Sequence, residues 1–150
     1  MSDARRAHHR QIVPILRAGL VLLEDAATLL PAAQTFHLGL VRDEETLEAS
    51  MYLNKLPERF EPDDPVLICD PMVATGGSLI AAVEECLRRG ATLEYMRVVC
   101  VVCAPPALTK MGEMFKGLKI YTAMIDPELN EKGYIVPGLG DAGDRTYGTM

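Results

Sequence analysis

The segment 66–78 combines residue types that could hold a phosphorylated sugar. An apolar run at 66–69 ends at Asp70, and the sequence A-T-G-G-S at 74–78 then opens a stretch with helical spacing. Backbone N–H groups at a helix N-terminus bind anions, and glycines let the backbone approach such a ligand closely. A carboxylate beside them can accept hydrogen bonds from sugar hydroxyls or hold Mg²⁺ through water. The segment therefore predicts a phosphate-binding loop with one carboxylate at its side.

Two well-known phosphate loops do not fit the segment. A P-loop requires a lysine directly after its last glycine, and none follows Gly77. A dinucleotide-binding loop requires the spacing G-x-G-x-x-G, which the adjacent glycines Gly76 and Gly77 lack. For the sequence T-G-G-S on its own, an ordinary strand-to-helix turn with Thr75 or Ser78 as the N-cap is an equal alternative.

The elements that must position this loop alternate along the chain. Apolar runs predict strands at 11–16, 36–41, 65–70, 96–103 and 118–125, and the run at 96–103 is typical of a strand buried on both faces. Helices are expected at 19–30, between Leu79 and Gly90 and at 105–115, with a β-hairpin around 51–56 and no regular element at 133–144. This alternation indicates an α/β fold with a mainly parallel central sheet flanked by helices on both sides. In such folds ligands bind beyond the carboxyl ends of the strands, which is where Asp70 falls.

The composition indicates a single globular domain. The chain has 150 residues, of which 49% are hydrophobic, and we divide it into a polar N-terminal lead at 1–12 and one domain at 13–150. A formal net charge of −6 argues against nucleic acid as a partner. No apolar run approaches the roughly 20 residues that span a membrane, and the basic segment 1–10 lacks the apolar centre of a secretory signal. We therefore expect no membrane partner.

The four cysteines are expected to be structural. Cys100 and Cys103 form a C-x-x-C pair, but they fall within the predicted strand at 96–103. Residues three apart on a strand face opposite sides, so this pair is not expected to share one metal ion or one disulfide. Free cysteines are usually buried, and reduced thiols are typical of the cytoplasm, where we expect this protein to reside.

Four segments together resemble the uracil phosphoribosyltransferase family, a branch of the type I phosphoribosyltransferases. They are VPILRAGL at 13–20, RDEETLE at 42–48, DPMVATGGS at 70–78 and GYIVPGLGDAGD at 133–144. They occur in the order of the family, and the resemblance runs from about Val13 to Thr149. It implies a type I fold with a β-hairpin arm and a C-terminal base-binding loop. It also implies a transferase of pyrimidine salvage, which converts uracil and 5-phosphoribosyl 1-pyrophosphate to UMP and pyrophosphate with Mg²⁺.

The resemblance also implies roles for individual residues. The ribose 5-phosphate would be held by the 70–78 loop, which comprises Asp70, Pro71, Met72, Val73, Ala74, Thr75, Gly76, Gly77 and Ser78. Arg17 and Arg42 would bind the pyrophosphate, although a solvated surface arginine is the alternative for each, and Arg42 could equally pair with its acidic neighbours. The groups that would bind uracil are at Ile135, Gly140, Asp141 and Ala142, and Asp141 would also reach the phosphoribosyl substrate.

Catalysis is thus expected from Asp70, Arg17 and Asp141. Mg²⁺ would arrive with the pyrophosphate rather than be bound directly by the protein, with Asp70 or Asp141 contacting it through water. The resemblance further implies a homodimer or higher homo-oligomer, with GTP as a candidate allosteric effector. Family members usually carry a substantial segment before the VPILRAGL sequence, and residues 1–12 do not resemble it. The alternative function is a non-catalytic or regulatory module that binds uracil or UMP.

Overall fold

The computed structural model describes residues 10–24, 26–43 and 49–149. Its main sheet contains eight strands: β1 (Gln11–Leu16), β2 (Gln34–Thr35), β3 (Leu38–Arg42), β4 (Ala49–Asn54), β5 (Val66–Cys69), β6 (Met72–Val73), β7 (Met96–Cys103) and β8 (Lys119–Ile125). The path through the sheet is β4-β3-β1-β5-β7-β6, while β2 pairs with β1 and β8 pairs with β7. All these pairs are parallel except β3 with β4. The predicted mainly parallel sheet is confirmed.

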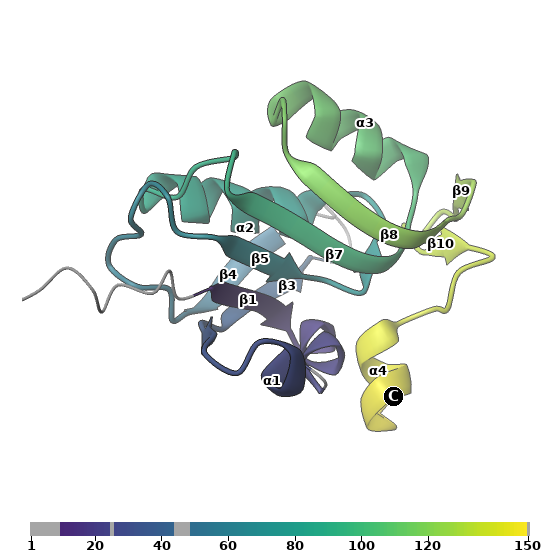
Figure 1. Ribbon diagram of the computed structural model, residues 1–150. Coiled ribbons are helices and arrows are strands. Elements are labelled where there is room, and N and C mark those ends of the chain that lie inside the picture. Colours follow the sequence, from purple (N-terminus) through teal and green to yellow (C-terminus); the bar gives the residue numbers. More distant parts are fainter. Residues whose placement is uncertain (1–9, 25, 44–48, 150) are drawn as a thin grey trace, which may run out of the picture.

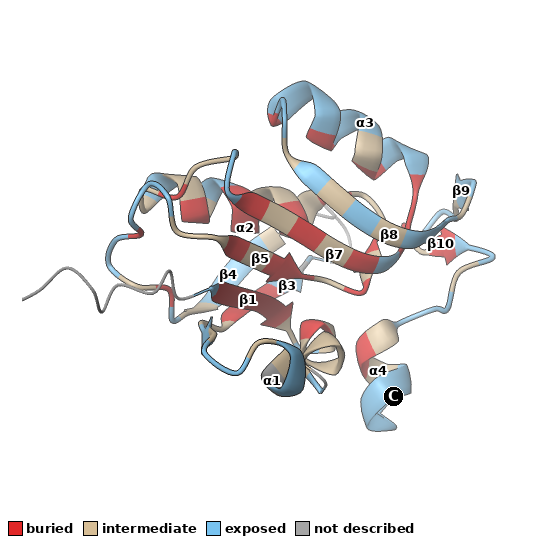
Figure 2. Cartoon of the chain, in the orientation of Figure 1, coloured by how far each residue is buried: buried red, intermediate tan, exposed pale blue. Residues whose placement is uncertain are grey.

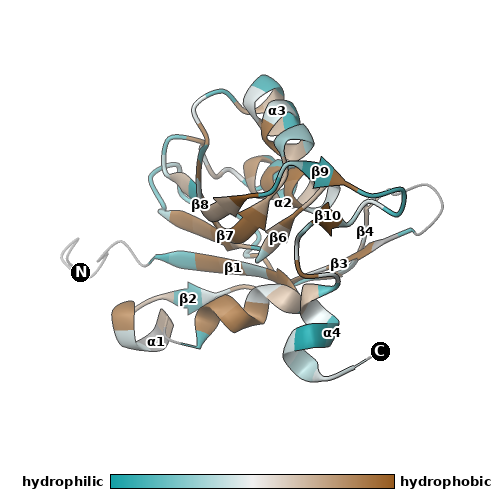
Figure 3. Cartoon of the chain, turned by 90° about the vertical axis from the view of Figure 1, so that its right-hand side faces the viewer, coloured by the Kyte–Doolittle hydropathy of each residue, from teal (hydrophilic) through white to brown (hydrophobic). Residues whose placement is uncertain are grey.

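Helices lie on both sides of the sheet. One side carries α2 (Gly77–Arg88) and α3 (Pro105–Met114), and the other carries the 3₁₀ helix η2 (Ala18–Leu23) and the short helix α1 (Ala26–Leu29) (Figures 1 and 3). The single helix expected at 19–30 is therefore wrong. Its first part winds more tightly, with the N–H of Leu20 donating to the Arg17 carbonyl three residues earlier. Gly19 packs so closely on β5 that an added Cβ would collide with the Cys69 carbonyl oxygen.

The hairpin lies at a different place from the one predicted. It consists of β3 and β4, which pair from Leu38 with Asn54 to Arg42 with Ala49. The segment around 51–56 therefore supplies one strand of the hairpin instead of the whole of it. Residues 44–48, which follow β3 in the sequence, and the side chain of Arg42 lie outside what the structure describes. The predicted role of Arg42 in binding pyrophosphate accordingly stays a prediction.

The main hydrophobic core fills the space between the sheet and helices α2 and α3. Its largest fully buried side chains include Phe60, Leu38, Ile68 and Met96, and Phe60 meets Phe36 edge to face with ring centroids 6.5 Å apart. Figure 2 shows the buried residues concentrated on β1, β5 and β7. The strands of a parallel sheet are usually buried on both faces. This core buries the face of the sheet that packs against α2 and α3.

Strand β7 is not buried on both faces, contrary to expectation. Its residues alternate between buried and partly exposed from Met96 to Val101, because the described helices do not cover its second face. Near its end the strand is irregular, since the N–H groups of Val101 and Val102 both donate to the Pro71 carbonyl oxygen. Cys100 and Cys103 consequently belong to the same core cluster, so the expectation of opposite faces is wrong. All four cysteines are buried and free, as predicted.

The C-terminal segment contains regular structure that the sequence did not indicate. Strands β9 (Glu128–Leu129) and β10 (Ile135–Val136) form a small antiparallel sheet, and helix α4 (Ala142–Tyr147) follows it. The glycine-rich segment 133–144 was expected to have no such elements. No helix within the described part of the chain is long and apolar enough to cross a membrane.

Candidate functional site

A cleft of about 380 Å³ opens at the carboxyl ends of the parallel strands. These ends face the reader in Figure 3, with β10 and α4 beside them. The cleft is lined by four segments far apart in the sequence, namely the end of β1 with Arg17 and Ala18, two residues of β3, the 70–78 loop with Leu79, and the segment 133–143. The lining residues are Ile15, Leu16, Arg17, Ala18, Leu40, Val41, Asp70, Met72, Val73, Ala74, Thr75, Gly76, Gly77, Ser78, Leu79, Gly133, Tyr134, Ile135, Gly140, Asp141, Ala142 and Gly143.

The floor of the cleft is the N-terminus of helix α2. Gly76 precedes the helix with a positive φ of 84°, a conformation that glycine adopts without strain. No side chain caps the helix, so the alternative of an ordinary turn capped by Thr75 or Ser78 is not observed. The first N–H groups of an α-helix have no intrahelical partner and carry partial positive charge. Gly77 and Ser78 line the cleft at this end, so its floor is suited to an anion.

Asp70 lies at the break between strands β5 and β6. Both strands pair with β7, and the residues Asp70 and Pro71 interrupt the line that they form. The Asp70 N–H donates to the Val99 carbonyl at 3.1 Å, and its Oδ1 accepts a long hydrogen bond of 3.4 Å from the Met72 N–H. Burial raises the pKa of Asp70 to about 7, and the hydrogen bond from Met72 opposes that rise. Asp70 is therefore a carboxyl group whose charge a bound cation or donor would stabilise.

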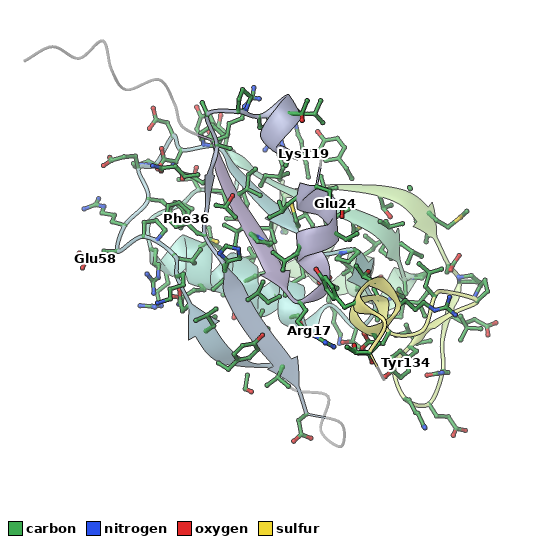
Figure 4. The ribbon with its side chains drawn as sticks, turned by 90° about the horizontal axis from the view of Figure 1, so that it is seen from below. Arg17, Glu24, Phe36, Glu58, Lys119 and Tyr134 are labelled. Atoms are coloured by element: carbon green, nitrogen blue, oxygen red, sulfur yellow. The ribbon has the colours of Figure 1, made fainter. Side chains whose placement is uncertain are left out.

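Arg17 follows β1 directly and is held by the C-terminal segment. Its Nη2 donates to Oδ1 of Asp144 at 2.8 Å, and its Nη1 donates to Oγ1 of Thr149 at 3.2 Å. Figure 4 shows Arg17 beside helix α4. The Thr149 hydroxyl and the Arg17 guanidinium both hold the pKa of Asp144 below its usual range. About half of the Arg17 side chain is exposed, so the guanidinium can still meet a ligand in the cleft.

Helix α4 approaches Arg17 through a capped first turn. Asp141 precedes the helix, and its Oδ1 accepts a hydrogen bond of 2.9 Å from the Asp144 N–H, as N-cap aspartates commonly do. Gly143 lies between this carboxylate and the guanidinium, and a Cβ there would be 3.2 Å from Asp141 Oδ1 and 3.6 Å from Arg17 Nη2. A residue without a side chain thus lets the two charged groups face the same cleft.

The segment before α4 is anchored to the 70–78 loop and to the end of β8. Ile135 is buried in a small cluster with Val102 and Ala104, against which Met72 and Ala74 pack. Farther along, the Gly138 N–H donates to Oδ2 of Asp126 at 2.9 Å. The walls formed by 70–78 and by 133–143 are therefore packed against each other rather than independent.

Nearly all the residues predicted from the sequence meet in this cleft. Pro71 is the exception among those whose side chains are described, because it is buried and its carbonyl oxygen accepts hydrogen bonds from β7. The sequence reasoning missed Asp144, Thr149 and Asp126. Asp144 lies within the GDAGD sequence, whose second acidic residue was a signal that could have been followed. Nothing in the spacing of Thr149 or Asp126 indicates what they contact.

The cleft offers two carboxylates to a metal, those of Asp70 and Asp141. Within the described residues, no three histidine, cysteine, aspartate or glutamate side chains are grouped so that they could hold a metal ion. Oxygen ligands of this kind suit Mg²⁺, which commonly keeps several water ligands and takes others from a phosphorylated substrate.

Comparison with known sequences points to one family. A family model described as "Uracil phosphoribosyltransferase" matches residues 2–149. The uracil phosphoribosyltransferase of Nostoc sp. is 62% identical over 138 residues, which are 92% of this chain and 64% of that protein. The enzyme of Nicotiana tabacum is 54% identical over 92% of this chain and 62% of its own length. The chain thus spans less than two thirds of the length of these relatives.

Comparison with solved structures gives the same fold. The AQ2163 protein from Aquifex aeolicus superposes with a TM-score of 0.84 at 45% identity, over 91% of this chain and 64% of that one. The APRTase from Giardia lamblia superposes with a TM-score of 0.63 at 20% identity, over 81% of this chain and 72% of that one. The second likeness concerns the fold alone.

Proposed function

The chain belongs to the uracil phosphoribosyltransferase family, and from this premise we propose that it transfers ribose 5-phosphate from 5-phosphoribosyl 1-pyrophosphate to uracil, forming UMP and pyrophosphate. One observation carries the proposal. A single cleft is lined by the uncapped N-terminus of α2, by Asp70 and Arg17, and by the residues Ile135, Gly140, Asp141 and Ala142. These groups match the phosphate, the sugar hydroxyls, the leaving group and the base of one reaction.

In the proposed arrangement the 5-phosphate lies at the start of α2. The N–H groups of residues 76–78 donate to its oxygens, and the helix dipole adds attraction for negative charge. Asp70 accepts hydrogen bonds from the ribose hydroxyls. Its pKa of about 7 in the free protein falls when such donors or a cation arrive, because both favour the ionised form.

Arg17 binds the pyrophosphate in this proposal. The bond from C1 of the ribose to the pyrophosphate oxygen breaks while the bond from C1 to N1 of uracil forms, and uracil loses its N1 proton. Negative charge grows on the pyrophosphate as it leaves, so a guanidinium beside it stabilises the transition state more than the ground state. Arg42 is proposed as the second arginine on the same group. Asp141 and solvent are the two acceptors open to the N1 proton.

Mg²⁺ fits the donors of this cleft. We propose that Asp70 and Asp141 contact the ion through water and that the substrate supplies most of its other ligands. When bound, Mg²⁺ would neutralise part of the charge on the pyrophosphate.

The segment 133–143 is proposed as the base pocket. Uracil presents an acceptor, a donor and an acceptor along O2, N3–H and O4, and main-chain groups at Ile135, Gly140 and Ala142 can offer the complement. Cytosine lacks the N3–H and carries an amino group in place of O4, so buried partners would be left unpaired. Discrimination against cytosine should therefore be strong.

The test is a chemical assay with a binding measurement beside it. Labelled uracil, 5-phosphoribosyl 1-pyrophosphate and Mg²⁺ should yield UMP in proportion to the amount of protein, and labelled cytosine should yield no CMP. Calorimetry should detect UMP binding. Binding without any UMP formation would replace the enzyme by a non-catalytic module that retains the pocket.

We further propose that the chain forms homo-oligomers and works in the cytoplasm. Exposed apolar side chains on and near β8, among them Tyr121, Met124 and Ile125, are each more than half exposed and would gain from a covering surface. The four free, buried thiols are compatible with a reducing compartment. A mass in solution equal to that of one 16.4 kDa chain at micromolar concentration would contradict the oligomer.

A further inference from the structure

Asp126 stands outside the cleft but fixes one of its walls. It follows β8, where its N–H donates to the Cys103 carbonyl oxygen of β7 at 3.0 Å, so its backbone is attached to the sheet. Its Oδ2 accepts the Gly138 N–H at 2.9 Å, twelve residues farther along the chain. The β9–β10 hairpin lies between the two partners. This hydrogen bond therefore closes the base of the hairpin onto the main sheet.

Gly138 is the point at which the chain turns back toward the cleft. Its φ is +47°, and a Cβ there would overlap the Ile135 carbonyl oxygen. The turn brings Ile135 on one side and Gly140 on the other into the same cleft, while Gly138 itself is not among the lining residues. A backbone that turns this tightly leaves its N–H pointing away from the neighbouring residues, and the Asp126 carboxylate is the acceptor that meets it.

The segment is held at other points on both sides of this turn. Ile135 is packed into the cluster near Met72 and Ala74, and Asp141 caps α4. Between these two points, Leu139 and Gly140 are exposed. The hydrogen bond from Gly138 to Asp126 thus ties the turn between Ile135 and Gly140 to the main sheet.

We propose that Asp126 is a positioning residue for the base. It never touches uracil, but it holds the turn so that the main-chain groups on both sides of Gly138 present their donors and acceptors at the correct separation. The inference rests on the proposed function, because it concerns the base pocket of that reaction. Main-chain recognition tolerates little displacement, since each buried partner left unpaired lowers affinity by about tenfold or more.

The test compares three variants with the wild-type chain. Asp126→Ala removes the acceptor. Asp126→Asn keeps an oxygen that can accept the Gly138 N–H but removes the charge. Glu128→Gln removes one charge from an exposed residue two positions away and serves as the control. The readouts are kcat, the KM for uracil and the KM for 5-phosphoribosyl 1-pyrophosphate.

Asp126→Ala should raise the KM for uracil about tenfold and leave the KM for 5-phosphoribosyl 1-pyrophosphate within twofold. Asp126→Asn should lie between Asp126→Ala and the wild type, and Glu128→Gln should match the wild type. A general loss of folded protein would lower the apparent kcat without changing either KM, so a rise in the KM for uracil alone distinguishes positioning from instability. Equal changes in the two KM values, or an unchanged KM for uracil, would overturn the role of Asp126.

An NMR measurement separates this inference from the proposed function. The Gly138 amide should exchange with solvent at least tenfold faster in Asp126→Ala than in the wild type, and exchange at an equal rate would show that the hydrogen bond does not restrain the turn. If the wild-type chain neither forms UMP nor binds uracil, the proposed function is wrong. If it is active and Asp126→Ala keeps the uracil KM of the wild type, only the role of Asp126 is wrong.

Discussion

Nη2 of Arg17 lies 2.8 Å from Oδ1 of Asp144, which joins the end of β1 to helix α4 across 127 residues of sequence. The same Oδ1 accepts the Thr149 hydroxyl, and the Tyr147 hydroxyl donates to the Arg17 carbonyl oxygen at 3.4 Å. The cation proposed for the leaving group is therefore already paired with a carboxylate before substrate binds. An incoming pyrophosphate has to compete with Asp144 for this guanidinium.

Replacing Asp144 should accordingly strengthen anion binding. In Asp144→Asn the side chain keeps its size, but it no longer neutralises part of the Arg17 charge. An exposed ion pair contributes little, so the Kd for pyrophosphate should fall by only about two- to fivefold. Isothermal titration with pyrophosphate and Mg²⁺ checks this. Weaker binding would mean that Asp144 serves mainly to orient Arg17, and the competition described above would be wrong.

The carboxyl group of Asp70 should make the free protein less stable as the pH rises. Its pKa is about 7 in the folded chain against an ordinary value of 3.8, so the folded state holds this proton to higher pH than the unfolded state does. Stability is then lost between about pH 4 and pH 7, by at most about 4 kcal/mol. Asp70→Asn carries no such group, so it should be more stable than the wild type at pH 8 and equal to it at pH 4.

Urea denaturation at the two pH values, in the presence of a chelator, measures this difference. Other titrating groups are shared by the two proteins and cancel in the comparison. A stability difference that does not change with pH would show that Asp70 titrates normally. The same variant should lose UMP formation while remaining folded.

Glu85 should have the opposite pH dependence. It accepts hydrogen bonds from Arg88, Arg89 and Asn54, which tie α2 to the end of β4. The hydrogen bond from Arg88 is the largest of the causes that lower the pKa of Glu85 to about 2. The folded state thus favours the ionised form, and this stabilisation is complete above about pH 4.5 and is lost as the pH falls toward 2.

Glu85→Gln should therefore be less stable than the wild type at pH 7, by on the order of 1–3 kcal/mol, with the difference shrinking toward pH 2. The neighbouring exposed residue provides the control, since Glu84→Gln removes the same charge from the same helix and should have little effect. Thermal melting of the wild type and both variants at several pH values measures these differences. Equal melting temperatures of the two variants at pH 7 would contradict the expectation.

Two glycine-to-alanine substitutions should have opposite signs. At Gly19 a Cβ would collide with the Cys69 carbonyl oxygen, so η2 would have to move away from β5, and Gly19→Ala should lower the free energy of unfolding by about 1–3 kcal/mol. At Gly112, within α3, a Cβ would meet nothing within 4 Å, and Gly112→Ala should raise it by about 0.5–1 kcal/mol. Urea denaturation measures both, and a stabilised Gly19→Ala variant would show that η2 is not packed as described.

Much of the fold could be predicted because its signals are local. The apolar runs at 11–16 and 96–103 are strands over the predicted range, since side-chain type and run length largely decide such elements. The 70–78 loop could also be predicted, because the strand, the carboxylate, the glycines and the helix follow one another directly in the sequence. The failures are tertiary in origin. The segment expected to be one helix at 19–30 instead contains the 3₁₀ helix η2, whose Gly19 lies against β5, and the separate short helix α1, and β7 is left uncovered on one face.

The site, like the fold, could be predicted from the sequence where its residues lie within one motif. Residues within one motif, such as Asp70 and Gly77, meet because the chain itself brings them together. The partnership of Arg17 with Asp144 depends instead on how α4 packs, and that of Asp126 with Gly138 depends on how the hairpin between them folds back. The sequence separation of the two residues in each pair matches no known motif, so neither pair could be predicted without the structure.

The most direct test of the central claim is the rate of UMP formation in the wild-type chain, in Arg17→Gln and in Arg59→Gln. Both substitutions remove one arginine charge, but Arg59 is exposed in the segment between β4 and β5, away from the cleft. The wild type and Arg59→Gln should form UMP at rates within twofold of each other. Arg17→Gln should be slower by at least about 100-fold, as is typical when a group that stabilises developing negative charge is removed. Equal rates in Arg17→Gln and the wild type, or no UMP from the wild type, would contradict the proposed transfer in this cleft.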